Sequence, residues 1–386
     1  MPINGNSRLA LAALLATAAG AAQAEIVVGV ITSQSGPISS IGIPYARGIA
    51  AGQEYIGEAG GEKFRVIVLD DASDASNASK FARKLIEEDK ADVLIGSAGA
   101  PATAAMIAVA TELKVPAIAI APVVSVPQAD GKPWAISVVQ PPSDMVAAVV
   151  QQMVKMGVKN AGYIGFNDSW GDLVYNNGKL AGDKLGMTIS TNERYARADT
   201  SVSGQILKVI AGRPDGVLIG GSGTGGALPY LALAERGFKG PIFGTPAIIN
   251  PDFVRLAGAS AEGTIASTGP VMVVDQLQDD HPSKKIGQAF KAAHLKANNV
   301  ASNDGFSAYA FDGWIVLADA AKRALATGAK PGSPAFRSAL RDAIYSVKEI
   351  AGSHGVYNFT AANPFGTDMR ALVLVKLDKG QWTYLK

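Results

Sequence analysis

The feature that most constrains the fold is a stretch in which two short apolar runs each end in small residues. The first run, Val93 to Ile95, is followed by Gly96 to Ala100, and Pro101 then stands where the first turn of a helix tolerates proline. The second run, Pro116 to Ala121, ends in a turn that extends to Ser125. This order predicts strand, helix, strand. Both turns then lie at the carboxyl ends of neighbouring parallel strands, where open α/β sheets bind ligands.

The first of these turns also predicts an anion site. Backbone N–H groups in the first turn of a helix lack partners within the helix, and they attract negative charge. Because Ser97, Gly99 and Ala100 are small, a ligand carboxylate can approach this backbone closely. The alternative is that the small residues only allow helix and strand to pack, and the rest of the chain favours ligand binding.

Composition describes an ordered globular protein and excludes some partners. The 386 residues suggest about two domains. Hydrophobic residues make up 48% and charged residues 18%, which is typical of a chain with a large core. The net charge is only +2, from 35 Lys and Arg against 33 Asp and Glu, without a basic stripe. Nucleic acid is therefore not expected as a partner.

Residues 1–24 predict a signal peptide. Arg8 precedes an apolar run from Leu9 to Ala19, and Ala22 to Ala24 form a small-x-small cleavage site. The chain has no cysteine, which excludes disulfides, thiolate catalysis, cysteine metal sites and a lipid anchor on cysteine. We therefore expect a protein exported to the periplasm, soluble and without a lipid anchor.

From residue 25 the strand and helix patterns alternate and predict two lobes. Among them are an amphipathic helix from about Pro44 to Glu58 and a strand from Thr188 to Glu193. We assign residues 25–140 to lobe 1 and, after the break at two consecutive prolines, residues 141–269 to lobe 2. Three helical patterns without a strand between them, within residues 270–348, suit a return to lobe 1. Strand patterns in residues 349–386 then complete lobe 2. The predicted fold is α/β, with two Rossmann-like lobes, each a mostly parallel sheet flanked by helices.

One glycine-rich motif matches the sequence pattern of a dinucleotide-binding site. Gly221 to Gly226 satisfies G-x-G-x-x-G, follows a strand pattern and precedes a helix. Such a site also needs an acidic residue at the end of the next strand, and Phe243 to Pro246 contains none. We interpret this run, with Ser222 and Gly223, as a second small-residue turn that faces the cleft between the lobes.

Other candidate chemistry has simpler explanations. Asp70, Asp71 and Asp74 lack the spacing of a calcium loop and suit caps before a helix. The three histidines show no metal spacing and are expected at the surface. No nucleophile elbow is present. We therefore predict no metal, no cofactor and no enzymatic activity.

Several short motifs follow one another along the chain in an order that can be compared with known families. They are Ser35 to Pro37, Asp70 with Asp71, Gly96 to Pro116, Ala121 to Ser125, Trp170 with Gly171, Pro214 to Val217, Gly237 to Lys239, and Phe311 with Asp312. By their order and spacing the chain resembles the periplasmic solute-binding proteins of ABC transporters, in the branched-chain (hydrophobic) amino-acid family. The resemblance covers essentially all of the chain after residue 24, and it implies the type I fold, whose two lobes are joined by a three-strand hinge.

The resemblance also implies a site. In this family the positions that correspond to the turn around Ala100 and to the turn at Val123 and Ser125 hold the ligand's carboxylate. An aromatic residue at the position of Trp170 covers the ligand's side chain. The remaining residues implied or expected to face the ligand are Ile41, Ser97, Gly99, Pro101, Val124, Ser222, Gly223, Thr245, Pro246 and Phe306.

One departure from the family bears on specificity. Amino-acid binders of this family place an acidic residue after the strand that corresponds to Pro241–Gly244, where it pairs with the ligand's ammonium group. This chain has Thr245, Pro246 and Ala247 there. A buried ammonium without a partner costs several kcal/mol. We therefore expect a hydrophobic carboxylate without an α-amino group, such as an aromatic or branched aliphatic acid or a keto acid, unless Asp168 or Asp304 reaches the pocket.

The expected function is that of a monomeric receptor that closes around this ligand by hinge motion and delivers it to an inner-membrane ABC permease. Two alternatives stay open. One is a branched-chain amino-acid-binding protein with a relocated partner for the amine. The other is a small-molecule sensor of the same fold, which would need a separate partner protein.

Overall fold

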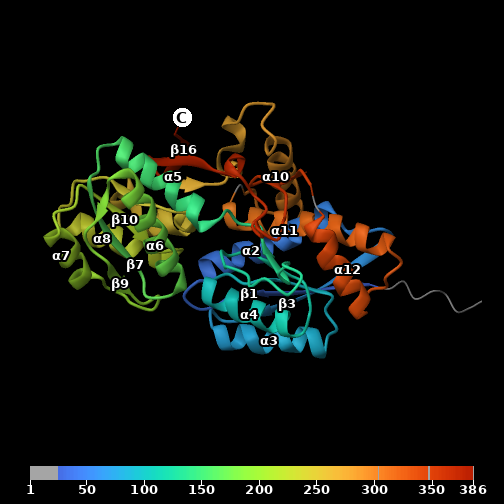
Figure 1. The fold of residues 1–386 in the computed structure, drawn as a ribbon. Helices are drawn as coiled ribbons and strands as arrows, with labels where there is room; N and C mark the ends of the chain where they lie inside the picture. The colour runs from blue at the N-terminus through green and yellow to red at the C-terminus, as the bar shows by residue number, and fades with distance from the viewer. Residues whose placement is uncertain (1–24, 303, 347, 386) are drawn as a thin grey trace, which may run out of the picture.

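Two α/β lobes lie side by side and are linked near the middle of the molecule (Figure 1). The computed structural model describes residues 25–302, 304–346 and 348–385, and the predicted signal peptide lies outside them. Each lobe contains a mostly parallel sheet with helices on its faces, so the predicted fold class is confirmed. No helix among the described residues is both long and apolar enough to span a bilayer.

Lobe 1 is built on a six-stranded sheet in the order β2-β3-β1-β4-β5-β6, in which only β2 is antiparallel to its neighbour. Its strands are β1 (Ile26–Thr32), β2 (Glu58–Ala59), β3 (Glu62–Asp70), β4 (Val93–Gly96), β5 (Ala117–Ala119) and β6 (Ala135–Ser137). Its helices are α2 (Ser39–Tyr55), α3 (Ala75–Glu87), α4 (Ala100–Glu112), α10 (Lys284–Asn298), α11 (Gly305–Ala326) and α12 (Pro334–Tyr345).

Lobe 2 is built on an eight-stranded sheet in which β16-β15-β12-β11-β10-β7-β8 are consecutive and β9 also pairs with β7. The strands are β7 (Asn160–Phe166), β8 (Thr188–Ile189), β9 (Glu193–Tyr195), β10 (Gly216–Gly220), β11 (Ile242–Gly244), β12 (Ile265–Thr268), β15 (Val373–Asp378) and β16 (Gln381–Tyr384). Its helices are α5 (Pro142–Lys155), α6 (Ser169–Leu185), α7 (Ser203–Ala211), α8 (Leu228–Glu235) and α9 (Pro251–Ala257). Short 3₁₀ turns are η1 (Thr224–Ala227), η2 (Pro246–Ile248), η3 (Gly258–Ala261), η4 (Pro270–Gln276) and η5 (Met369–Ala371).

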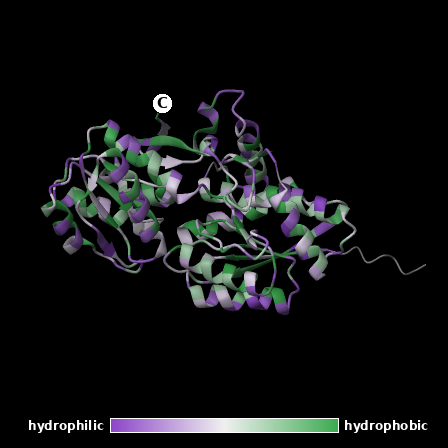
Figure 2. Ribbon diagram, in the orientation of Figure 1, coloured by the Kyte–Doolittle hydropathy of each residue, from purple (hydrophilic) through white to green (hydrophobic). Residues whose placement is uncertain are grey.

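The central strand β1 shows how the sequence builds two cores in one lobe. Val27 and Ile31 belong to the cluster with α3 and α4, whereas Val28 and Val30 belong to the cluster with α2 and α11. Successive side chains of a strand point to opposite faces, so a continuous apolar run fits a sheet covered on both sides. Figure 2 shows the same arrangement, with hydrophobic residues on the strands and hydrophilic residues on outer helix faces and loops.

The structure differs from the sequence prediction at three places. Helix α2 begins at Ser39 rather than Pro44, because Ile38 and Ile41 are buried and the carbonyl oxygen of Gly42 accepts a 2.9 Å hydrogen bond from Thr32 Oγ1. Helix α5 was not predicted, and it begins at Pro142, where the first turn tolerates proline. The strand predicted from Thr188 to Glu193 is two short strands, β8 and β9.

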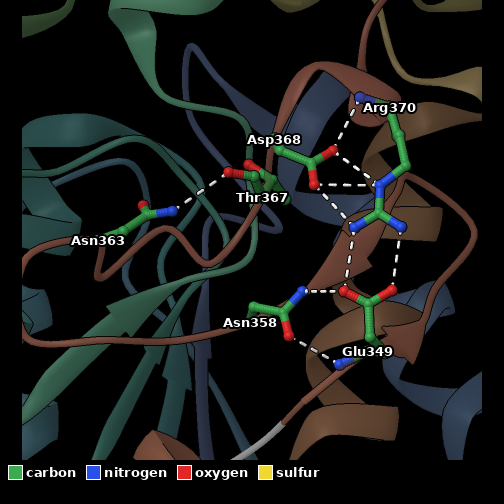
Figure 3. Close-up of polar contacts among 6 residues, drawn as sticks. All are labelled: Glu349, Asn358, Asn363, Thr367, Asp368 and Arg370. Atoms are coloured by element: carbon green, nitrogen blue, oxygen red, sulfur yellow. Dashed lines mark hydrogen bonds and ion pairs between the residues drawn. The ribbon is translucent and has the colours of Figure 1, made fainter.

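Three segments cross between the lobes, and hydrogen bonds connect them. Gln140, in the first crossing, donates from Nε2 to the carbonyl oxygen of Ala371, in the third, at 2.7 Å. The hydroxyl of Tyr309 on α11 donates to the side-chain oxygen of the same Gln140. Figure 3 shows part of the third crossing, where the guanidinium of Arg370 bridges Asp368 and Glu349 at 2.7 and 3.0 Å.

The final return of the chain to lobe 2 occurs at a later residue than predicted. The hairpin of β13 (Ile350–Ala351) and β14 (Val356–Tyr357) packs on lobe 1 rather than lobe 2. Its Tyr357 hydroxyl donates to the carbonyl oxygen of Val138 at 2.9 Å and to Asp312 on α11 at 2.8 Å. Contacts with the lobe 2 sheet begin at Val373, so the predicted boundary at residue 349 is corrected to this strand.

Candidate ligand-binding site

A small cavity lies between the lobes, at the carboxyl ends of both sheets. Its volume is about 40 Å³. Lobe 1 contributes Ile41, Tyr45, Ala98, Gly99, Ala100, Ala121, Pro122 and Phe306, and lobe 2 contributes Trp170, Arg197, Ser222 and Ala247. We call this space the acid cavity.

The lobe 1 wall of the acid cavity is apolar and rigidly packed. The rings of Tyr45 and Phe306 meet edge to face, 5.6 Å apart. Burial raises the pKa of Tyr45, and its hydroxyl donates to the carbonyl oxygen of Ile120. Gly99 precedes α4 without any side chain that caps the helix, so the helix begins at the cavity edge with free first-turn N–H groups.

The lobe 2 wall begins at the start of α6. Asp168 caps this helix, since its Oδ1 accepts hydrogen bonds from the backbone N–H groups of Trp170 at 3.0 Å and Gly171 at 3.2 Å. The cap fixes the backbone of Trp170, and the indole N–H donates to the carbonyl oxygen of Gly221 at 3.4 Å. Trp170 is 4% exposed, so its ring is held as a buried wall of the cavity.

Arg197 is the cationic side chain of the acid cavity and was not among the predicted residues. Its Nε donates to Asp168 Oδ2 at 2.6 Å, and one terminal nitrogen donates to Ser222 Oγ at 2.9 Å. The guanidinium also lies over the ring of Phe166, 4.2 Å from its centroid. A guanidinium has five N–H donors, so these contacts hold it in place and leave donors for a ligand.

The lobes touch directly beside this cavity. The backbone N–H of Thr224 in lobe 2 donates to Ser40 Oγ in lobe 1 at 3.2 Å. Gly223 lies so close that a Cβ on it would be 2.6 Å from the same oxygen. The structure therefore has the cleft closed at this edge.

Six predicted site residues line the acid cavity: Ile41, Gly99, Ala100, Trp170, Ser222 and Phe306. Two more, Val123 and Val124, line an adjoining groove together with Leu173 and Asn176 of α6. Val124 is 69% exposed, so it lies at the outer rim rather than around a buried ligand.

The other predicted residues do not line the acid cavity. Ser97 is fully buried, and its hydroxyl donates to Asp71 Oδ2 at 2.5 Å, so it is occupied within lobe 1. Thr245 and Pro246 are buried at the start of η2, and the next residue, Ala247, reaches the cavity instead. The remaining three are Pro101, in the first turn of α4, Ser125, which is buried, and Gly223, which contacts Ser40.

Neither Asp168 nor Asp304 is a free partner for a ligand amine in the acid cavity. Both oxygens of Asp168 accept hydrogen bonds, from the start of α6 and from Arg197. Asp304 lines a separate cavity. The described residues contain no group of three or more side chains placed to hold a metal ion. Two of the histidines expected at the surface, His294 and His354, are instead buried.

The comparisons with known proteins agree with this architecture. The periplasmic binding protein family matches residues 25–381. An extracellular ligand-binding receptor from Rhodopseudomonas palustris HaA2 superposes with a TM-score of 0.89 at 40% identity, over 94% of this chain and 100% of that one. A Leu/Ile/Val-binding protein homologue from Brucella melitensis is 24% identical, over 84% of this chain and 85% of its own.

A third relative shares the fold at lower identity. It is a solute-binding protein of an ABC transporter from Rhodopseudomonas palustris in complex with benzoate, with a TM-score of 0.76 and 21% identity over 94% of this chain and 95% of its own. At that identity the likeness concerns the fold alone. The chain belongs to the periplasmic binding protein family and has the type I two-lobed fold of its Leu/Ile/Val-binding members.

Proposed function

We propose that this protein is the receptor of an ABC importer and captures a hydrophobic carboxylate in the acid cavity. The observation that carries the proposal is Arg197, a guanidinium held beside apolar and aromatic walls. Arginine is well suited to carboxylates because its planar donors match two carboxylate oxygens. The apolar walls at Ile41, Phe306 and Trp170 suit an aromatic or branched aliphatic body.

The two lobes offer complementary groups to such a ligand. Lobe 1 offers the N-terminus of α4, which favours negative charge, and lobe 2 offers Arg197. A carboxylate between them contacts both lobes only when the cleft is closed. Its binding free energy therefore favours the closed state over the open one, which is how a hinged receptor signals that it is loaded.

The charges around the acid cavity support an acid more than an amino acid. Asp168 pairs with the lining residue Arg197, and its oxygens are already engaged by Arg197 and the start of α6. An α-ammonium group would therefore lack an acidic partner among the described lining residues. The benzoate-bound relative supports the acid, whereas the Leu/Ile/Val-binding homologue supports a branched-chain amino acid as the second candidate.

The test compares ligands that differ only at the α-carbon, which bears a keto oxygen in one member of each pair and an ammonium group in the other. Protein refolded without ligand is titrated by calorimetry with 4-methyl-2-oxopentanoate and leucine, and with phenylpyruvate and phenylalanine. We expect the keto acid of each pair to bind more tightly, because only the amino acid brings an unpaired buried charge. Tighter binding of leucine would reject the acid in favour of the amino-acid receptor.

A variant pair tests the role of Arg197. Arg197→Met should weaken acid binding about 10- to 100-fold, since a hydrogen bond to a charged group contributes about 1.5–3 kcal/mol. Arg236→Met is the matched control, because Arg236 is exposed at the end of α8 and does not line the cavity. Equal affinities of the two variants would show that Arg197 does not hold the carboxylate.

A further inference from the structure

The cation of the acid cavity is paired with an acidic side chain behind it. Arg197 is the one charged residue among the lining residues that the structure describes, and Asp168, which does not line the cavity, accepts from its Nε at 2.6 Å. Only 18% of each side chain is exposed, so water screens these two charges less than those of an ordinary surface ion pair. A ligand in the cavity therefore meets a cation whose charge is already offset.

Both members of this pair are held in place by other contacts. Asp168 Oδ1 caps α6, so the carboxylate cannot turn away from Arg197 without giving up the cap. Arg197 also donates to Ser222 Oγ at 2.9 Å. The guanidinium has five N–H donors and uses two of them in these contacts, which leaves three for a ligand. A ligand carboxylate can therefore bind to Arg197 while Asp168 stays in place.

The sum of these charges sets how much negative charge the cavity accepts. Arg197 and Asp168 cancel, and the N-terminus of α4, which no side chain caps, contributes roughly half a positive charge. One ligand carboxylate changes this sum to roughly minus one half. A second carboxylate on the same ligand adds a full negative charge, which Asp168 repels in a site where little water screens the repulsion. These charges favour a ligand with one negative charge over a ligand with two.

We propose that Asp168 restricts the acid cavity to ligands with a single negative charge, so that dicarboxylates and other dianions are rejected. This inference rests on the proposed function and adds a limit to the substrate class. Asp168 acts through Arg197 and is a positioning residue, which fixes the guanidinium and offsets its charge. Ser222 also fixes the guanidinium but carries no charge, so the two residues have separable effects.

The test uses three acids that share one apolar body. 4-Methylpentanoate has one carboxylate, and isobutylmalonate adds a second carboxylate to the α-carbon. The half-amide of isobutylmalonate has nearly the size of the diacid but a single negative charge. Protein refolded without ligand is titrated with each acid by calorimetry at about pH 7.5, where carboxylates are ionised. We expect the wild-type protein to bind the half-amide about tenfold or more tightly than the diacid, because the two ligands differ chiefly in charge.

Three variants separate the charge of Asp168 from its effect on position. Asp168→Asn removes the charge and keeps an oxygen that caps α6, so the preference for the half-amide over the diacid should fall about tenfold. Ser222→Ala removes a hydrogen bond to Arg197 without a change of charge, so both ligands should bind more weakly and the preference should stay. Asp183→Asn is the matched charge control, because Asp183 lies at the other end of α6, is 58% exposed and pairs with Lys179.

Three results would overturn the inference. The first is equal affinity of the wild-type protein for the diacid and the half-amide, which needs no variant. The second is an unchanged preference in Asp168→Asn, which would show that Asp168 only positions Arg197. The third is an equal fall in Asp183→Asn, which would assign the effect to the net charge of the protein. If the wild-type protein binds neither 4-methylpentanoate nor the keto acids, the proposed function fails as well, so the singly charged acids distinguish the two failures.

Discussion

At the scale of single residues, His354 differs strongly from a histidine in water. The ring is fully enclosed, stacks on Tyr309 with 3.8 Å between ring centroids, and places Nε2 2.8 Å from the carbonyl oxygen of Gly305. Burial lowers the pKa of His354 to about 3, from an ordinary 6.5. The unfolded chain therefore takes up a proton between pH 6.5 and 3 that the folded chain does not. The contribution of this residue to stability is complete above pH 6.5 and is lost as the pH falls.

Asp312 contacts the same segment and has the opposite effect on how stability depends on pH. Its carboxylate accepts from the backbone N–H groups of Ser353 and His354 at 2.7 and 2.9 Å, and burial raises its pKa to about 6. The folded chain binds this proton more readily than the unfolded chain between about pH 6 and 4. Acidification in that range therefore favours folding through Asp312, and it partly offsets the effect of His354.

We predict that His354→Gln changes the pH dependence of stability. The amide can still donate to Gly305, but it does not titrate. Relative to this variant, the wild-type protein should lose about 1.4 kcal/mol of unfolding free energy for each pH unit between about 6 and 4. Urea denaturation at pH 7, 6, 5 and 4 measures the unfolding free energy of both proteins. Parallel pH profiles would show that His354 is not held neutral.

Four residues that the sequence analysis placed around the ligand, Ile41, Ala100, Trp170 and Phe306, line the acid cavity. That they contact a ligand stays a prediction. Arg197 was missed because the strand before it was predicted to end at Glu193, although it continues as β9 to Tyr195. An arginine two residues past a parallel strand is itself a signal of a site. Ser97 could not be judged, because its partner Asp71 is distant in sequence.

At the scale of elements, lobe 1 depends on the close approach of α2 and α11. A Cβ on Gly48 would be 2.0 Å from the carbonyl oxygen of Ser307, and one on Gly52 would be 2.5 Å from Trp314 Cβ. Glycine is unfavourable within a helix, so its presence here is explained by the backbone contact. Sequence periodicity located both helices, but nothing local in it indicated that they pack this tightly.

We predict opposite effects for two Gly→Ala changes in helices. Gly48→Ala should lower the unfolding free energy by about 1–3 kcal/mol, because the methyl group forces α2 away from the backbone of α11. Gly204→Ala in α7 should raise it by about 0.5–1 kcal/mol, since a Cβ there meets nothing within 4 Å and alanine favours the helix. Thermal or urea denaturation of both variants measures these changes in unfolding free energy. A stabilised Gly48→Ala protein would contradict the packing argument.

At the scale of the whole molecule, the contact between Ser40 and Thr224 marks where the lobes meet. Gly223 has φ +54° and ψ −148°, a conformation that favours glycine, and a Cβ on it would lie 2.6 Å from Ser40 Oγ and 3.3 Å from Ile41 Cγ1 in the other lobe. A side chain at this position therefore opposes closure as well as straining its own loop.

We predict that Gly223→Ala weakens binding of the acid about tenfold or more and shifts the protein toward an open form. Small-angle scattering with and without ligand measures the shape, and calorimetry measures the affinity. Adding Ser40→Ala should recover part of the affinity, because it removes the oxygen 2.6 Å from the new Cβ. If the double variant binds no better than Gly223→Ala alone, the loss comes from loop strain rather than from blocked closure.

The order in which the chain visits the lobes has a consequence for its biosynthesis. Helix α2 packs against α11, and β12 pairs with β15, so each lobe receives an essential element only from the last third of the sequence. A copy that stops before Val373 leaves β12 paired with β11 on one side and unpaired on the other, and an unpaired strand edge promotes aggregation. We therefore expect a chain shortened before Val373 to aggregate or be degraded rather than to fold into a receptor with reduced affinity.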